Sequence, residues 1–132
     1  MKPVDQTRFG WPHGNCYAAC VASILEIRIE ACPETPDPET WDATWDAWLN
    51  ERNLARIVFT YNRELAWPGW QILCGPTDTL GPHGENLWHA CVGLNGELIH
   101  DPNPTRGGFL NGEIRQVEIL YLLNPATGWR RA

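Results

Sequence analysis

Residues 13–26 read HGNCYAACVASILE, and this stretch decides how the rest of the chain is interpreted. A Gly-Asn turn signal precedes Cys16, and the residues from Tyr17 onward are apolar almost all round, the pattern of a helix buried inside a fold. We expect this helix to span 17–26 and to form the centre of the scaffold. Cys16 therefore stands at the N-terminus of a buried helix.

The position of Cys16 favours a reactive thiolate. Unpaired backbone N–H groups and the dipole at a helix N-terminus favour negative charge there. Cys20 lies one turn further in, among apolar neighbours that suppress ionisation, so we interpret it as a packing thiol. A cysteine nucleophile also needs a base. The candidates are His13, His83, His89 and His100.

A second helix is expected after the breaker cluster at 33–38. Asp37 and Pro38 are a good N-cap and first-turn pair, so we expect this helix to begin there. Its apolar stripe has the spacing i, i+4, i+7, i+8 and consists of Trp41, Trp45, Trp48 and Leu49. Because such a stripe is typical of core residues, we favour a core role over a ligand-stacking platform.

Beyond Asn53 the chain changes to short β-rich pieces. The expected strands are 56–61, 71–74, 88–94, 97–101 and 116–123. Helices first and strands second indicate an α+β fold, with the cysteine-bearing helix packed on a small antiparallel sheet. The segments 75–86 and 102–112 are rich in Gly, Pro and Asn, and we expect them to be exposed loops that line a cleft.

Length, charge and cysteine content limit the function classes. The 132 residues predict a single domain over 1–132. The net charge of −6 and the pI near 5.1 argue against a nucleic-acid surface. Neither a membrane-spanning run nor a secretory signal is recognised, so we expect a cytoplasmic protein without a membrane partner. The five cysteines are expected to stay thiols, and we expect no metal and no cofactor.

The strand that carries His89 continues into a hairpin, and the register of this hairpin decides whether His89 meets Asp101. A two-residue turn at 95–96 would point the two side chains to opposite faces. A three-residue loop with a bulge would pair Gly93 with Glu97 and set His89 directly across from Asp101. We predict the bulged register, in which the carboxylate orients the imidazole as the third member of a triad.

Three neighbours of this pair have competing interpretations. Cys91 shares the face of His89 in the bulged register and would pack under the site. His100 is the rival base, but strand alternation turns it away from Asp101, so we interpret it as structural. Asn103, in the following loop, is the rival to Asp101 as the group that orients the imidazole.

Acyl transfer also requires hydrogen-bond donors for an oxyanion. The backbone N–H of Cys16 is a natural donor because it opens the helix. Gln6 and Asn15 are both available to complete an oxyanion hole. We prefer Gln6, which lies ten positions earlier and can fold back across the cleft, whereas Asn15 is explained as a turn or cap residue.

The order of these residues resembles that of the papain-like cysteine peptidases. An N-terminal Gln, Gly-Asn-Cys at the start of a buried helix, a His on a strand and an Asp-Pro pair are most similar to the compact bacterial branch typified by bacteriocin leader-processing peptidase domains of ABC exporters. The similarity covers 6–25 and 88–104. It implies a minimal papain-like fold and hydrolysis of a peptide or protein substrate through a thioester acyl-enzyme. The implied catalytic residues are Gln6, Cys16, His89 and Asp101.

Two alternatives to a peptidase remain open at the level of the sequence. The same triad serves acyltransferases and deamidases that act on a small amine or a glutamine side chain. A non-catalytic papain-like module would instead bind peptides through its cleft, with the eight tryptophans supplying apolar contact area.

Overall fold

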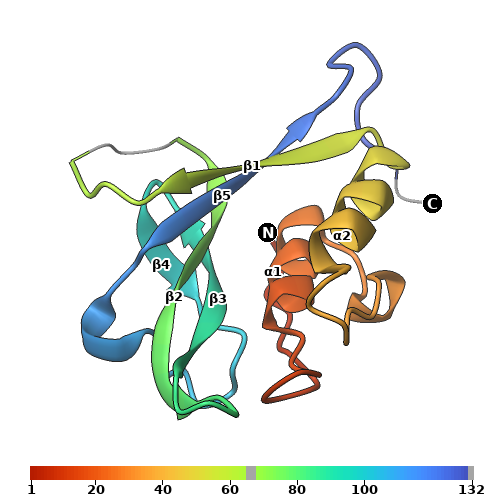
Figure 1. Ribbon diagram of the computed structural model, residues 1–132. Helices are drawn as coiled ribbons and strands as arrows, with labels where there is room; N and C mark the ends of the chain where they lie inside the picture. The colour runs from red at the N-terminus through yellow and green to blue at the C-terminus, as the bar shows by residue number, and fades with distance from the viewer. Residues whose placement is uncertain (65–67, 131–132) are drawn as a thin grey trace.

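The computed structural model describes residues 1–64 and 68–130 of the chain, and its elements are drawn in Figure 1. The helices are α1 (Cys16–Leu25) and α2 (Trp41–Asn50), with short 3₁₀ turns at η1 (Ile29–Ala31) and η2 (Leu110–Gly112). The strands are β1 (Leu54–Thr60), β2 (Trp70–Leu80), β3 (Asn86–Leu94), β4 (Glu97–His100) and β5 (Gln116–Leu122). None of the helices within the described residues is long and apolar enough to cross a membrane.

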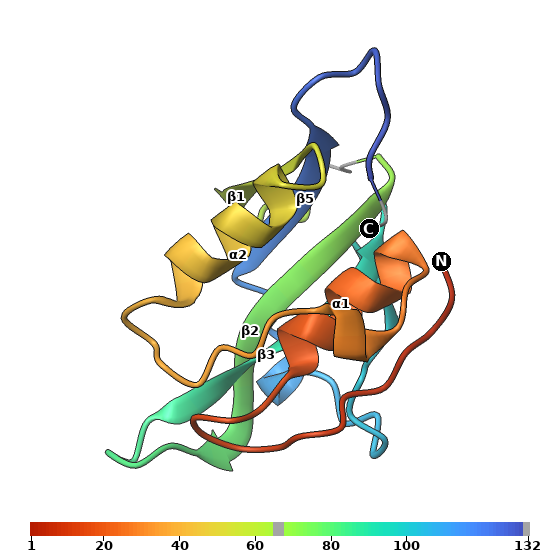
Figure 2. The same ribbon diagram turned by 90° about the vertical axis from the view of Figure 1, so that its right-hand side faces the viewer.

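The five strands form one antiparallel sheet in the order β1-β5-β2-β3-β4. Helix α1 packs on β3 and β2, and helix α2 packs on β1. Both helices lie on the same side of the sheet, as the two perpendicular views show (Figures 1 and 2). The predicted α+β class is confirmed, and so is the packing of the cysteine-bearing helix on a small antiparallel sheet.

Helix α1 is the central helix that the sequence predicts, shifted by one residue at each end. Most of its side chains are buried, including Ala19, Cys20, Val21 and Ala22, which are fully enclosed. Its polar Ser23 is also buried, and the Ser23 hydroxyl donates to the Ala19 carbonyl at 2.7 Å and accepts from the Val4 N–H at 2.9 Å. The helix stops where Glu26 adopts a left-handed conformation (φ 57°).

Helix α2 confirms the tryptophan stripe as core but begins later than predicted. Trp45 and Trp48 are buried, and Trp41 is half-buried. The expected start at Asp37 is wrong: the Asp37 carboxylate accepts from the N–H of Glu39 instead, and residues 37–40 form a turn that precedes the helix. The aspartate therefore organises the approach to α2 rather than its first turn.

Strand β2 extends six residues beyond its predicted end, so the expected loop over 75–86 is wrong for 75–80. Considered on their own, the glycine and the proline at 75–76 indicate a loop. The pairing of β5 with β2 ends at Cys74, however, and beyond it β2 has a strand neighbour on one side only, where a proline is tolerated. At Gly75 a Cβ atom would come within 2.2 Å of the Glu113 carbonyl oxygen, so the close backbone approach requires glycine.

Side chains are buried on both faces of the sheet. The larger cluster lies between the helices and the sheet and includes Ile72 and Val92. A smaller cluster on the opposite face consists of Leu73, Cys91, Phe109 and Val117. Phe109 belongs to the segment 102–112, so the expectation that this whole segment is exposed is wrong at this residue, which covers the second face of the sheet.

Candidate active site

The turn of the β3–β4 hairpin differs from the predicted register. It has two residues, 95–96, both with positive φ (53° and 84°), and Leu94 pairs directly with Glu97. The predicted three-residue loop is therefore wrong. A regular continuation of this two-residue turn would leave His89 and Asp101 on opposite faces of the sheet.

A bulge within β4 reverses that outcome. Gly93 pairs with Leu98, but the next pair is Val92 with His100, so Ile99 is an extra residue in β4. Because side chains alternate along a strand, one extra residue turns everything beyond it to the other face. The carboxylate that follows β4 thereby reaches the face of the candidate base on β3.

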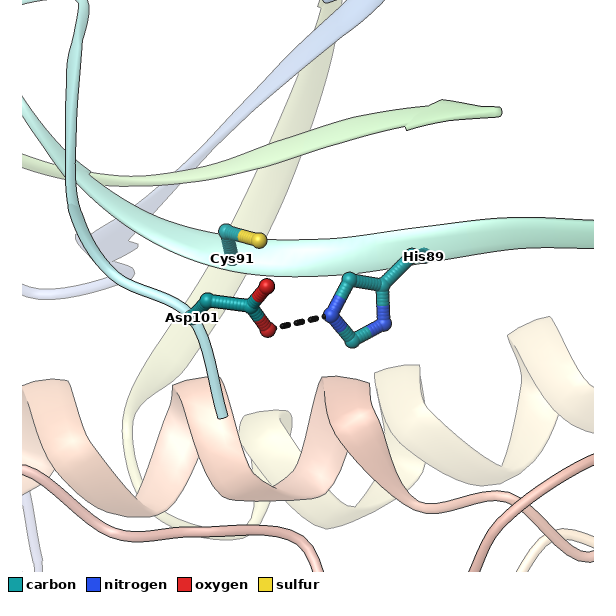
Figure 3. A group of neighbouring side chains, drawn as sticks. All are labelled: His89, Cys91 and Asp101. Atoms are coloured by element: carbon teal, nitrogen blue, oxygen red, sulfur yellow. Dashed lines mark hydrogen bonds and ion pairs between the residues drawn. The ribbon is translucent and has the colours of Figure 1, made fainter. Parts of the chain in front are cut away.

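His89 and Asp101 are in direct contact. The His89 Nε2 atom lies 2.6 Å from the Asp101 Oδ1 atom (Figure 3), and both side chains are nearly buried. The Asp101 carboxylate also accepts from the N–H groups of Asn103 (2.9 Å) and Gly108 (2.7 Å), and the Cys91 thiol hydrogen-bonds to it. Burial opposes its ionisation, but these bonds outweigh burial and hold the pKa of Asp101 below its ordinary value.

Cys16 lies on the other side of the imidazole. It is the first residue of α1, it is half-buried, and it lies close enough to His89 to affect the pKa of the imidazole. Burial disfavours the charged imidazole, but the interactions with Cys16 and Asp101 outweigh this effect and raise the pKa of His89 to about 9. At neutral pH the ring is therefore an imidazolium placed between two groups that favour its positive charge. With Nε2 occupied by Asp101, Nδ1 is the nitrogen left for the thiol.

The two candidate oxyanion residues have different surroundings. Gln6 is buried beside the cavity that Cys16 lines, and its Nε2 donates to the Arg8 carbonyl at 3.0 Å. Its Oε1 is buried and has no hydrogen-bond partner among the residues that the structure describes. The Asn15 amide instead accepts from the N–H groups of Thr7 and Arg8, each at 2.9 Å, and donates to the Thr7 hydroxyl. Asn15 thus anchors the N-terminal segment, and Gln6 is the one beside the cavity.

The other candidates have structural surroundings. His100 contacts the Val4 carbonyl through Nε2 at 3.0 Å and is buried away from the imidazole of His89. Asn103 offers its N–H to Asp101, while its side chain accepts from Thr105. The remaining histidines, His13 and His83, are exposed in loops.

Two supporting residues have no signal in the sequence. Arg106 donates to both carboxylate oxygens of Asp5, at 2.6 and 2.9 Å, and to the backbone carbonyl of Asp101 at 2.7 Å. The Gln6 N–H donates to the Pro102 carbonyl at 2.9 Å. The segment that carries Gln6 is therefore fastened to the loop that carries Asp101. Asp5 and Arg106 are 101 positions apart, so no local pattern indicates this ion pair.

The same site contains three potential metal ligands within the described part of the chain. One ligand atom each from His89, Cys91 and Asp101 lie within 4.8 Å of one another (Figure 3). Burial and the neighbouring charge of Asp101 raise the pKa of Cys91 well above its ordinary value, so its sulfur is a neutral thiol beside the charged pair. A metal ion bound here would have to displace the proton of this thiol and the hydrogen-bond donors of Asp101.

The candidate catalytic residues open into a large cavity of about 1060 Å³. Cys16, His89, Asp101 and Gln6 all line it. This volume is slightly above the range of about 300–1,000 Å³ that is typical of sites for drug-sized ligands. The cavity therefore gives a substrate access to the thiol and the imidazole together.

Comparison of the chain with protein-family models, with curated proteins and with solved structures gives no match. The resemblance to papain-like peptidases thus rests on the motifs in the sequence. The chemistry of the site rests on its own geometry.

Proposed function

We propose that this protein is a cysteine peptidase, a thiol hydrolase that cleaves a peptide or related amide bond on a minimal papain-like scaffold. The observation that carries the proposal is the position of His89, which interacts with Cys16 on one side and with Asp101 on the other. A nucleophile, a base and an orienting carboxylate in this order are the parts of a catalytic triad. The cavity beside them supplies room for the substrate.

The reaction follows from the charges of the site. The Cys16 thiolate attacks the carbonyl carbon of the scissile amide, and the imidazolium of His89 donates its proton to the leaving nitrogen as the C–N bond breaks. The product is a thioester on Cys16 and a free amine. Neutral His89 then takes a proton from water, whose oxygen attacks the thioester, and the sulfur departs as the thiolate beside the imidazolium that has formed. The carboxylic acid product leaves and the enzyme is regenerated.

Asp101 and the oxyanion donors support these steps. The carboxylate holds the ring in one orientation and stabilises its charged form. The backbone N–H of Cys16 has no acceptor within the helix because it belongs to the first turn. The bond to Arg8 uses one of the two Nε2 hydrogens of Gln6. We assign the other hydrogen, together with the N–H of Cys16, to the developing oxyanion.

Selective alkylation tests the nucleophile. Brief treatment with iodoacetamide at pH 7, followed by mass mapping, is expected to modify Cys16 first. Cys74 is the internal comparison, because it is also half-buried and lines the same cavity. Burial and the charge of Glu118 raise the pKa of Cys74 well above its ordinary value, so its thiol stays neutral and slow.

Two variants complete the test. His89→Ala is expected to slow alkylation of Cys16 to the rate of an ordinary thiol, because the stabilising imidazolium is lost. Cys16→Ala is expected to abolish amide hydrolysis of a peptide mixture. Equal labelling of Cys16 and Cys74 in the wild type, or hydrolysis that persists in Cys16→Ala, would contradict the proposal.

A further inference from the structure

The cavity extends beyond the candidate catalytic residues and crosses most of the sheet. Ala90 on β3 pairs with Cys74 on β2, and Cys74 pairs with Gln116 on β5. Two residues further along β5, Glu118 pairs with Val58 on β1. All five residues line the cavity. Three interstrand spacings separate β3 from β1, a distance of about 14 Å. An extended peptide covers about 3.3 Å per residue, so about four residues span this length.

The far end of the cavity carries an excess of negative charge. Arg56 on β1 binds Glu118 at 2.9 Å and Asp46 at 2.8 Å, and it also binds Asp42. One guanidinium thus faces three carboxylates. Asp42 is 78% exposed and has a second carboxylate oxygen that Arg56 does not bind. Among the described residues that line the cavity, Arg56 is the one arginine or lysine. A further exposed carboxylate, that of Asp78, lies toward the other end of the cavity, on β2 beyond the pair of Gly75 with His89.

Aromatic side chains accompany these charges. Trp41, at the start of α2, lines the far end of the cavity and packs edge-on against Tyr17, with 4.7 Å between ring centroids, and the Arg56 guanidinium already lies over the Trp41 ring, 5.1 Å from its centroid. Near the catalytic end, Phe9, Trp11 and Trp88 line the cavity with about half of their surface exposed. Exposed apolar groups beside a cavity indicate a surface that binds a partner, and aromatic faces attract cations.

We infer that the substrate is an extended, basic polypeptide segment with a lysine or arginine about three or four residues from the scissile bond, whose cation lies against Asp42. This inference rests on the proposed peptidase function, because it takes Cys16 as the point of cleavage. The charge excess at the far end selects the cation, and the width of the sheet from the strand of His89 to the strand of Arg56 sets its distance from the scissile bond. An acidic segment would meet unfavourable charge along the same path.

Cleavage of a random decapeptide mixture tests the preference directly. New termini produced by the wild type and absent with Cys16→Ala are identified by mass spectrometry. We expect lysine and arginine to be enriched at one position, three or four residues to one side of the cleaved bond. Cleavage without this enrichment, or with enrichment of aspartate and glutamate there, would overturn the inference while leaving the peptidase proposal intact.

Binding to inactive protein supplies a second readout that needs no turnover. Three pools of fluorescent decapeptides are prepared, with lysine in the first, norleucine in the second and glutamate in the third at the positions tested. Each pool is titrated with Cys16→Ala at low and high salt. We expect the lysine pool to bind about fivefold more tightly than the norleucine pool at low salt, the size of one exposed ion pair, and to lose this advantage at high salt. The glutamate pool is expected to bind most weakly.

Two further variants locate the effect. Asp42→Asn in the Cys16→Ala protein is expected to reduce the lysine advantage to less than twofold, whereas Glu97→Gln, which removes an equal charge on the exposed strand β4, is expected to preserve it. Selective binding of the lysine pool without any cleavage by the wild type would contradict the peptidase proposal and support the basic ligand. An unchanged lysine advantage in Asp42→Asn would overturn the inference.

Discussion

His89 lies between two partners that both favour its charged form, the sulfur of Cys16 on one side and the carboxylate of Asp101 on the other. The ring is nearly buried, which alone would favour the neutral form. The interactions with these partners outweigh the effect of burial because the partners lie close to the ring in a region with little water, where charge interactions are strong. The same interactions that prepare the site for chemistry therefore also contribute to the stability of the fold.

This contribution has a defined pH dependence. The pKa of His89 is about 9 in the folded protein and 6.5 for an ordinary histidine. A raised pKa stabilises the folded state fully below about pH 6.5, and the stabilisation is lost as the pH rises through about 9. We expect the difference in free energy of unfolding between wild type and His89→Gln to shrink steadily between these values, as measured by urea denaturation.

His100→Gln is the matched control for this measurement. The His100 ring contacts the Val4 carbonyl and the Asp5 carboxylate, whereas His89 contacts Asp101. Its replacement is expected to cost about 1–2 kcal/mol through the lost hydrogen bond. A difference between wild type and His89→Gln that stays constant from pH 6 to 9.5 would contradict the assigned pairing of His89.

At the scale of elements, the short strand β4, which has four residues, decides which face of the sheet the Asp101 carboxylate reaches. Its extra residue, Ile99, reverses the side-chain alternation that the two-residue turn sets. Asp101 follows one residue after the strand ends and takes its direction from it. The loop 102–108 then fixes the carboxylate through the N–H groups of Asn103 and Gly108.

Deletion of Ile99 is expected to remove this reversal. Asp101 would then point to the opposite face, and His89 would lose the carboxylate that holds its ring beside Cys16. We expect alkylation of Cys16 at pH 7 to slow at least about tenfold while the far-UV circular dichroism stays close to that of the wild type. Ile99→Ala keeps the residue count, and because Ile99 is 47% exposed this control is expected to alkylate at the wild-type rate.

These elements also show how far prediction from the sequence reaches. Helix α1 and the core role of Trp45 and Trp48 follow from periodicity, because the contacts that build a helix are local. The His89–Asp101 contact is predicted, but through the wrong hairpin register. The bulge depends on bonds to a distant segment, such as that from the Gln6 N–H to the Pro102 carbonyl, and no local pattern contains them.

The end of β2 could not be predicted for a similar reason. Glycine and proline at 75–76 indicate a loop when only their own conformational preferences are considered. Gly75 is required because the backbone at Glu113 passes close to it, and Pro76 is tolerated where β5 no longer pairs with β2. Both facts depend on the neighbours that the fold supplies.

At the scale of the whole molecule, one buried polar network joins both helices to the sheet. Glu118 on β5 accepts from the Tyr17 hydroxyl of α1 at 2.8 Å and from Arg56 of β1 at 2.9 Å, and Arg56 also binds Asp42 and Asp46 of α2. The side chains of Glu118 and Arg56 are 5% and 10% exposed. Removal of one partner would therefore leave a charge enclosed without compensation.

We expect Arg56→Met to reduce the free energy of unfolding by about 3–5 kcal/mol, because Glu118 loses its cation. The double variant Arg56→Met/Glu118→Gln is expected to recover part of this loss. Arg28→Met is the surface control: Arg28 is 86% exposed, and its replacement is expected to change stability by less than about 0.5 kcal/mol. Urea denaturation measures all three, and equal stability of Arg56→Met and wild type would contradict the role given to the network.

The fastening of the N-terminal segment to the loop after β4 has a consequence for biosynthesis. The Arg106–Asp5 and His100–Val4 contacts span 101 and 96 positions, and the imidazole and carboxylate follow the thiol by most of the chain. A ribosome therefore releases the sulfur long before it releases the imidazole and the carboxylate. A growing or truncated polypeptide that ends before β3 lacks His89 and Asp101, so the hydrolysis that we propose would arise only after the loop that follows β4 has been made.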